Sequence, residues 1–307
     1  MAVNLYHNHK TNKKMKNFKL TNLMLLALVV LVSSCSSDDL DDTPKSTALT
    51  LDLNGLDNLG PDYLYEGWVI VNGAPVSTGT FSVDDNHNLS QTSFTLDADV
   101  LASATKFVLS IEPNPDPSSA PADTKVFIGD FNGNSASLTT GTVAPSFDAI
   151  TGKFIIAAPT GTGTEEEKYS GVWFLDNSSG SPVAGLELPA LEAGWKYEGW
   201  VVIDGVPLST GTFTSVDVAD DASPFSGSNP GPNYPGEDFL VNAPDGVSFP
   251  TDVRGKVAVI SIEPYPDNSA APFTLKPLFG MIPSDAVGVQ QIGAYVAESY
   301  PTGMVTR

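Results

Sequence analysis

The chain carries the same long motif twice, 132 positions apart. Residues 65–81 and 197–213 agree at 12 of 17 positions, and both begin Tyr-Glu-Gly-Trp-Val and end Ser-Thr-Gly-Thr-Phe. A second anchor, Ser-Ile-Glu-Pro, occurs at 110–113 and again at 261–264. Two anchors repeated in the same order predict a duplicated module. Each module must then give these residues the same strand environment.

The alternation of residue types predicts an all-β fold. Short runs rich in Val, Ile, Phe and Thr alternate with Gly, Pro, Asn and Asp, and no stretch after residue 35 keeps a 3.6-residue apolar period. Asn72-Gly73 and Asp204-Gly205 lie inside the two motifs, and such pairs supply the positive φ angles of tight turns. Each motif is therefore predicted to form a β-hairpin. Further strands are expected at 93–96, 107–112, 125–128 and 154–157.

The repeat spacing predicts two tandem antiparallel β-sandwich modules of immunoglobulin-like type, at 46–160 and 170–307. The Gly-, Thr- and Glu-rich segment 161–169 is expected to link them. The second anchor recurs at an offset of 151 instead of 132, so the second module carries 19 extra residues between Phe213 and Val257. Long loops on a rigid β frame are frequent sites of function.

The N-terminus, residues 1–34, has the features of a lipoprotein signal peptide. Lysines precede an apolar run at 23–32 that is too short to span a bilayer, and small residues lead to Cys35, the only cysteine. We expect Cys35 to carry lipid and to anchor the protein to the outer membrane, with the acidic segment 35–45 as a tether. The Ser-Asp-Asp pattern after Cys35 resembles the export signal of surface-exposed lipoproteins. A solvated spacer beneath the membrane is the alternative.

The charge of the chain excludes one class of partner. Without residues 1–34 the chain has ten Lys and Arg against 36 Asp and Glu, a net charge of −26. Such a surface repels phosphate backbones, and no cluster of lysines counters it. Nucleic-acid binding is not expected.

The residue inventory also excludes several kinds of catalytic site. His87 is the only histidine after residue 35, so Cys/His zinc sites and Cys/His nucleophiles cannot be built. A Ser/His/Asp triad would need His87, yet the sequence has no Gly-x-Ser-x-Gly turn to present a serine. We interpret His87 as an exposed turn residue.

Both modules place a pair of glutamates near a tryptophan: Glu66 and Glu112 with Trp68, then Glu198 and Glu263 with Trp200. Two facing carboxylates could act as acid and base on a glycoside. Glutamates that tie strand ends together through backbone amides, or pair with Lys125 or Lys276, are the interpretation we favour. The tryptophans lie among Val and Ile and are expected in the core, with a sugar-stacking platform as the alternative.

The insertion at 217–252 mixes acidic and aromatic residues. Tyr234 and Asp238 are candidates for binding a ligand there. In the alternative, the aromatic residues only pin the loop to its own module; these are Phe225, Tyr234, Phe239 and Phe249. Acidic pairs such as Asp220-Asp221 could bind Ca²⁺, but the sequence has no Asp-x-Asp-x-Asp-Gly loop, so no metal and no other cofactor is predicted.

A family resemblance rests on the stretch from Leu186 to Phe213. Its Leu-Pro-x-Leu opening, its Tyr-Glu-Gly-Trp strand and its Ser-Thr-Gly-Thr-Phe return resemble the extracytoplasmic C-terminal domain of anti-sigma-K factors. The Ser-Ile-Glu-Pro anchor followed by Ala271-Pro272 is similar to a later strand of that domain. The resemblance implies a β-sandwich that senses or binds something outside the cytoplasm, with no catalytic residues to carry over.

The same resemblance marks a departure in function. Anti-sigma factors hold their sigma factor with a cytoplasmic N-terminal domain before a membrane helix, whereas a lipoprotein signal would remove the few residues before Cys35. We therefore expect no sigma-factor partner. The sequence predicts a non-catalytic envelope lipoprotein that binds or scaffolds an envelope protein or a glycan. A carbohydrate-active surface protein using the paired glutamates is the alternative, and a relay of envelope stress to a membrane partner is a third.

Overall fold

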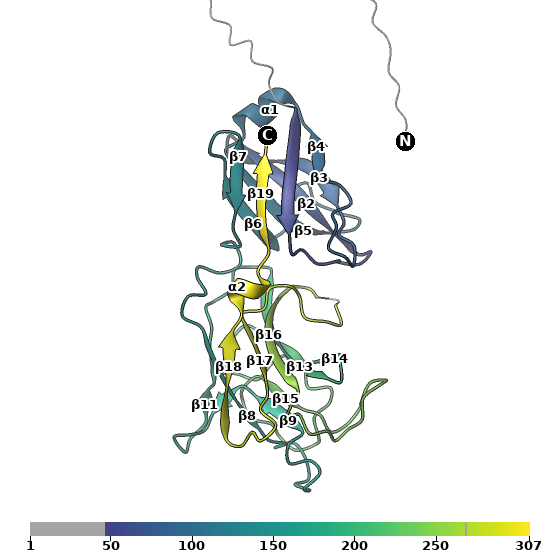
Figure 1. Ribbon diagram of the computed structural model, residues 1–307, viewed down its shortest axis with the longest axis vertical. Helices are drawn as coiled ribbons and strands as arrows, with labels where there is room; N and C mark the ends of the chain where they lie inside the picture. The colour runs from purple at the N-terminus through teal and green to yellow at the C-terminus, as the bar shows by residue number, and fades with distance from the viewer. Residues whose placement is uncertain (1–46, 268) are drawn as a thin grey trace, which may run out of the picture. The chain divides into compact units, whose positions relative to one another are not determined.

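The computed structural model describes residues 47–267 and 269–307, which are almost entirely β-structure (Figure 1). All pairings between its named strands are antiparallel within this part of the chain. The predicted all-β, antiparallel class is confirmed, while the immunoglobulin-like type stays a prediction. The predicted signal peptide, Cys35 and the whole of the tether at 35–45 lie outside the described residues.

Two four-stranded sheets contain most of the N-terminal half. Sheet I has the order β4 (Ser93–Thr95), β1 (Ala48–Asn54), β19 (Thr302–Thr306), β7 (Ser135–Leu138). Sheet II has the order β3 (Ala74–Phe81), β2 (Tyr63–Val71), β5 (Lys106–Pro113), β6 (Lys125–Asp130). A short helix, α1 (Ala98–Ser103), precedes β5, and the carboxylate of Asp97 caps its first turn.

Sheet III has nine strands and contains the second motif. Its order is β14 (Val206–Phe213), β13 (Trp195–Ile203), β16 (Val257–Pro264), β17 (Leu278–Met281), β18 (Val289–Ala294), β8 (Thr151–Ile156), β9 (Gly171–Trp173), β15 (Gly236–Asp238), and β12 (Leu186–Glu187) also pairs with β8. A separate two-stranded ribbon joins β10 (Leu175–Asp176) to β11 (Val183–Ala184). The short helix α2 (Val296–Ser299) precedes β19.

Apolar side chains on alternate positions hold sheets I and II together. In β1, Leu49, Leu51 and Leu53 are buried while the residues between them are exposed, so one face of sheet I packs inward. The rings of Phe81 in sheet II and Phe94 in sheet I lie 6.2 Å apart between centroids. Each fully buried leucine or phenylalanine contributes about 1.5–3 kcal/mol. This burial makes the two sheets one packed unit.

The two sequence motifs form matching hairpins, as predicted. In β2–β3 the partners run from Tyr65–Phe81 to Val71–Ala74, and in β13–β14 from Tyr197–Phe213 to Ile203–Val206. Asn72-Gly73 and Asp204-Gly205 form the turns with positive φ at every residue. Both hairpins have a register shift directly before the tryptophan of the motif. The duplication hypothesis expects this identity of local structure.

The glycine before each tryptophan has a packing reason. A Cβ on Gly67 would collide with Thr78 Oγ1 and would press on the Phe107 ring. A Cβ on Gly199 would likewise collide with Thr210 Oγ1 and the Phe174 ring. Glycine is therefore required at this position, because a threonine of the paired strand and a phenylalanine ring lie against the backbone there.

The sheets divide the chain differently from the predicted modules at 46–160 and 170–307. Strand β8, expected in the first module, pairs with β18, β9 and β12 of sheet III. Strand β19, expected in the second module, lies between β1 and β7 in sheet I, as Figure 1 shows for the yellow C-terminal strand beside the purple β1. An alternating pattern reports which face of a strand is buried and carries no information on which strand is its neighbour.

The segment predicted to link the modules is also ordered. Glu167 accepts hydrogen bonds from the backbone amides of Thr162 and Gly163 at 2.7 and 2.9 Å. Thr160, just before this segment, is 3% exposed and packs on the insertion through Asp238. Residues 161–169 are thus a turn within the sheet III region and do not separate two halves of the structure.

Candidate binding site

A chain of buried hydrogen bonds runs through the second copy of the motif. Trp200 Nε1 donates to Ser261 Oγ at 2.8 Å, and that hydroxyl donates to Glu263 Oε1. Glu263 Oε1 also accepts from the backbone amide of Phe273 at 2.9 Å. Ser261 and Glu263 are at most 1% exposed. The chain ties β13, β16 and the loop after β16 to one another.

The first copy repeats this arrangement. Trp68 Nε1 donates to Ser110 Oγ at 2.8 Å, Ser110 donates to Glu112, and Glu112 Oε1 accepts from the backbone amide of Ala122 at 2.8 Å. In each copy a lysine then closes the loop, since Lys125 and Lys276 donate to the carbonyls of Ala122 and Phe273. These contacts agree with the interpretation that the glutamates tie strand ends together.

The other shared glutamate of each copy bonds across the hairpin. Glu66 accepts a hydrogen bond from Ser77 Oγ, and Glu198 accepts one from Ser209 Oγ. Glu66 is 7% exposed and Glu198 is 5% exposed, so both carboxylates lie beneath the surface. The hairpin serine and glutamate of the motif are therefore partners in both copies.

Burial shifts the ionisation of these carboxyl groups. The pKa of Glu198 is raised to about 7 and that of Glu263 to about 8, mainly by removal from water and in part by the charge of Asp267. Burial also raises the pKa of Glu112 above its ordinary value. Carboxyl groups in such surroundings are neutral more readily than surface ones, which favours hydrogen bonding over charge at these positions.

A cavity of about 960 Å³ opens where the loops around β2 meet the loop after β16. Its wall includes the aromatic rings of Tyr63 and Tyr265 and several prolines, among them Pro61 and Pro266. Tyr265 is 52% exposed, and Lys196 Nζ lies 4.1 Å from the centre of its ring. Aromatic rings and prolines beside polar groups are the usual lining of a ligand site.

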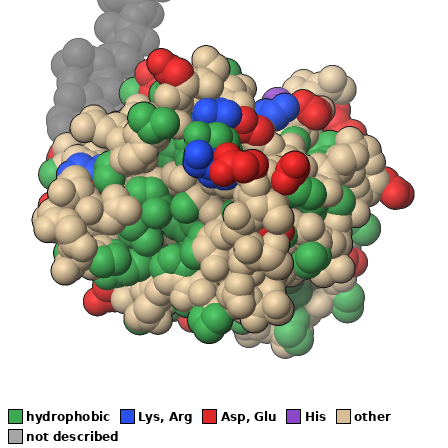
Figure 2. All heavy atoms as spheres, turned by 90° about the horizontal axis from the view of Figure 1, so that it is seen from below, with side chains coloured by type: hydrophobic (Ala, Val, Ile, Leu, Met, Phe, Trp, Pro, Cys, Tyr) green, Lys and Arg blue, Asp and Glu red, His purple; other side chains and the backbone are tan. Residues whose placement is uncertain are grey.

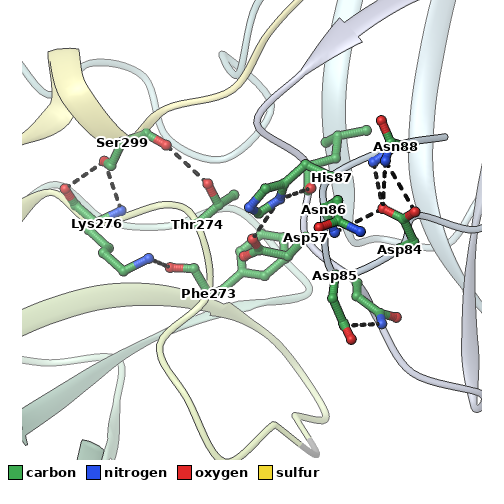
Figure 3. A network of polar contacts seen from close by, with 12 residues as sticks. Asp57, Asp84, Asp85, Asn86, His87, Asn88, Phe273, Thr274, Lys276 and Ser299 are labelled. Carbon is green, nitrogen blue, oxygen red and sulfur yellow. Dashed lines mark hydrogen bonds and ion pairs between the residues drawn. The ribbon is translucent and has the colours of Figure 1, made fainter. Parts of the chain in front are cut away.

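The polar side of the cavity is acidic, as Figure 3 shows for part of it. Asp57 is held by the backbone amide of Thr274, and burial raises the pKa of its carboxyl group, although Lys276 opposes the rise. His87 Nδ1 lies 2.9 Å from the Leu56 carbonyl oxygen and 3.8 Å from Asp57. His87 is exposed in a turn at φ 61°, as predicted. A cationic or hydroxyl-rich ligand would find acceptors on this side.

The insertion is packed on its own part of the structure. The rings of Phe225, Phe239 and Phe249 contact one another with centroids 5.5 to 6.0 Å apart. The Tyr234 hydroxyl donates to the carbonyl of Pro182 at 2.9 Å. These contacts agree with the alternative in which aromatic residues pin the loop.

Buried carboxylates strengthen this packing. Asp238 is fully buried and accepts from Trp173 Nε1 at 2.7 Å and from Thr160 Oγ1 at 2.5 Å. Glu237 accepts from Ser226 Oγ and from the Phe225 amide. Burial raises the pKa of Asp220 to about 8 and that of Glu237 to about 7. The candidate residues Tyr234 and Asp238 therefore lie in packing contacts, away from the cavity wall.

Of the candidate binding residues named from the sequence, Glu263 lines the cavity, as does His87, which was interpreted as a turn residue. In each copy, one glutamate and the tryptophan are joined through a serine hydroxyl, Glu112 to Trp68 and Glu263 to Trp200. Sequence reasoning missed Ser110 and Ser261, which join tryptophan to glutamate, and the tyrosines of the cavity. The signal for the serines was present, because both belong to the repeated Ser-Ile-Glu-Pro anchor.

The surface carries few basic groups on the face that Figure 2 shows, where they lie mostly beside acidic side chains. In the described part of the chain, helices are too short or too polar to cross a membrane.

The comparisons with known proteins give one match. Residues 39–125 match the family described as "Anti-sigma-K factor rskA, C-terminal". The matched segment covers the first hairpin and the first Ser-Ile-Glu-Pro anchor, through the start of β6. No curated protein and no solved structure matches the chain. The segment is thus similar to an anti-sigma-factor-like module, in agreement with the resemblance in the motifs.

Proposed function

We propose that this protein is a lipid-anchored, non-catalytic protein of the outer membrane, whose folded part binds an envelope protein or a glycan. The observation that carries the proposal is the cavity between the loops around β2 and the loop after β16, where the half-exposed Tyr265, the partly exposed Tyr63 and acidic side chains line one space. The match to an anti-sigma-K C-terminal module supports a role outside the cytoplasm. The anchor is Cys35, on the sequence argument given above.

The engagement of the shared glutamates supports a binding role over catalysis. A general acid or base must reach the proton that it transfers. Glu66 and Glu198 face serines of their own hairpins, and Glu112 and Glu263 hold backbone amides of their own loops. In these positions the carboxyl groups serve the fold.

Among the possible ligands, a glycan is favoured by the residues that line the cavity. Tyr265 presents a half-exposed ring at the cavity, and sugars stack on such rings. Asp84 and Asp85 lie on the same wall and offer acceptors for hydroxyl groups. A carbohydrate-active enzyme would in addition need two carboxyl groups about 5–10 Å apart around the bond to be cleaved.

Two experiments test the proposal. The Cys35→Ser variant is expected in the soluble fraction, while the wild-type protein stays with the outer membrane and is released only by detergent. Membrane retention of the variant would contradict the lipid anchor.

For binding, the protein is titrated with peptidoglycan fragments and outer-membrane polysaccharides, and crosslinked in intact cells to identify protein partners. Tyr265→Ala is expected to weaken the interaction about tenfold, whereas Met281→Ala, an exposed apolar residue outside the cavity, leaves it unchanged. Equal loss in both variants, or release of reducing sugar by the wild-type protein, would overturn the proposal.

A further inference from the structure

Three carboxylates of the second copy converge behind the cavity wall. One carboxylate oxygen from each of Glu198, Glu263 and Asp267 lies within 4.8 Å of the others. Glu198 and Glu263 are 5% and 1% exposed, whereas Asp267 is partly exposed and lines the cavity together with Glu263. The group therefore has two buried members and a third at its opening to solvent.

Unused acceptor atoms lie within this group. The Oε1 atoms of Glu198 and Glu263 accept hydrogen bonds from Ser209 and Ser261. The Oε2 atom of each glutamate is buried and has no hydrogen-bond partner among the residues that the structure describes. No lysine or arginine nitrogen of the described residues lies within ion-pair distance of either glutamate. An unpaired buried acceptor costs about 1–3 kcal/mol, more if charged, so a cation bound by these two glutamates would offset a cost that the fold otherwise carries.

We propose that Glu198, Glu263 and Asp267 bind a calcium ion. Oxygen is the ligand atom that calcium prefers, and its distance to calcium is about 2.3–2.6 Å, so one ion spans two oxygens up to about 5 Å apart. The separation in this group falls inside that limit. Magnesium binds at about 2.0–2.1 Å and would need the oxygens closer together. Water from the cavity completes the coordination sphere on the side of Asp267.

The first copy provides an internal comparison. Glu66, Glu112 and Asp116 occupy the equivalent sequence positions, and Glu112 holds the same kind of loop amide. Within the described residues, the set in the second copy alone brings three carboxylates this close. The equivalent substitutions in the first copy thus disturb the same fold contacts without touching the proposed ion.

The test uses the purified full chain after removal of metal ions with a chelator. In a calorimetric titration, each chain is expected to bind one calcium ion. Calcium should also raise the melting temperature of the protein. It should displace bound Tb³⁺, whose luminescence is excited through the buried Trp200. Asp267→Asn, at a partly exposed position, is expected to weaken binding about tenfold or more. Glu263→Gln is expected to abolish it, while Glu112→Gln leaves calcium affinity unchanged.

Several outcomes would overturn the proposal: no calcium binding by the wild-type chain, equal affinity in Asp267→Asn, equal loss in Glu112→Gln, or stronger binding of Mg²⁺ or Zn²⁺ than of Ca²⁺. In the absence of binding, the two glutamates would instead share protons. The inference does not depend on the lipid anchor or on the proposed partner, because calcium affinity is measured without either.

Discussion

Replacing Ser261 by alanine removes the centre of a buried chain of hydrogen bonds. Ser261 is fully buried, accepts from Trp200 Nε1 and donates to Glu263. Without the hydroxyl, the indole N–H is left without a partner and Glu263 loses one of its two donors. An unsatisfied buried donor costs about 1–3 kcal/mol, and the lost hydrogen bond to the carboxyl group of Glu263 costs about 1 kcal/mol. We therefore expect the free energy of unfolding to fall by about 2–4 kcal/mol.

Urea unfolding followed by tryptophan fluorescence measures this loss. All four tryptophans of the chain are buried, with exposed fractions of 2–4%, so unfolding changes their emission. With an m value of about 3 kcal/mol/M, the midpoint should fall by about 1 M. Ser110→Ala should produce a similar loss, because Trp68 and Glu112 make the same contacts. Ser215→Ala, at an exposed position, is the control and should change the midpoint little.

The reasoning also predicts coupling between the two partners. In a Trp200→Phe background, where no indole N–H needs an acceptor, Ser261→Ala should be less destabilising by about 1 kcal/mol or more. A midpoint for Ser261→Ala within about 0.2 M of the wild type, or full additivity in the double variant, would refute the role assigned to this hydroxyl.

Three further predictions concern other contacts. Gly199→Ala should destabilise the chain by several kcal/mol in thermal unfolding, because its Cβ would collide with Thr210 and Phe174, whereas Gly280→Ala meets only ordinary contacts and should be nearly neutral; equal effects would contradict the packing argument. Because the pKa of Asp220 is raised to about 8 in the folded state, this group contributes stability below about pH 4 and loses that contribution as the pH rises to about 8. Asp220→Asn should therefore reduce the fall in the free energy of unfolding between about pH 5 and 8, and an unchanged pH profile would contradict the assignment. Arg307→Ala removes donors to the carbonyls of Leu101 and Ala104 and should lower the melting temperature by a few degrees, a change that Arg254→Ala, at a surface pair with Asp252, should not match.

The features of the fold that could be predicted from the sequence are those that depend on a short stretch of residues, such as a turn that needs positive φ angles. Asn72-Gly73 and Asp204-Gly205 favour positive φ, so the two hairpins could be predicted from the residues of their turns. The strand that contains the first Ser-Ile-Glu-Pro anchor, predicted at 107–112, is β5 (Lys106–Pro113). In both cases the information lies within a few residues of the element that it determines.

The sequence did not predict contacts that depend on which strands become neighbours. Trp200 and Ser261 are 61 positions apart and meet because β13 and β16 pair in one particular register. Glu198 and Asp267 come together through the same register and the loop beyond β16. The assignment of β8 and β19 to modules failed for this reason, since both have the alternating pattern that any half-buried strand would show.

The place of β19 beside β1 affects the order in which the fold can be completed. Leu51 pairs with Val305, and Arg307 bonds to the carbonyls of Leu101 and Ala104, so sheet I lacks its central partner until almost all of the chain has been made. At about 5–20 residues per second, the roughly 250 intervening residues take about 10–50 s to synthesise, and pairs so distant in sequence form slowly. During that interval β1 presents an open edge, the kind of surface that recruits other strands. Export in an unfolded state followed by folding after release would avoid this hazard, and a chaperone that holds residues 47–138 apart from other chains would meet the same need.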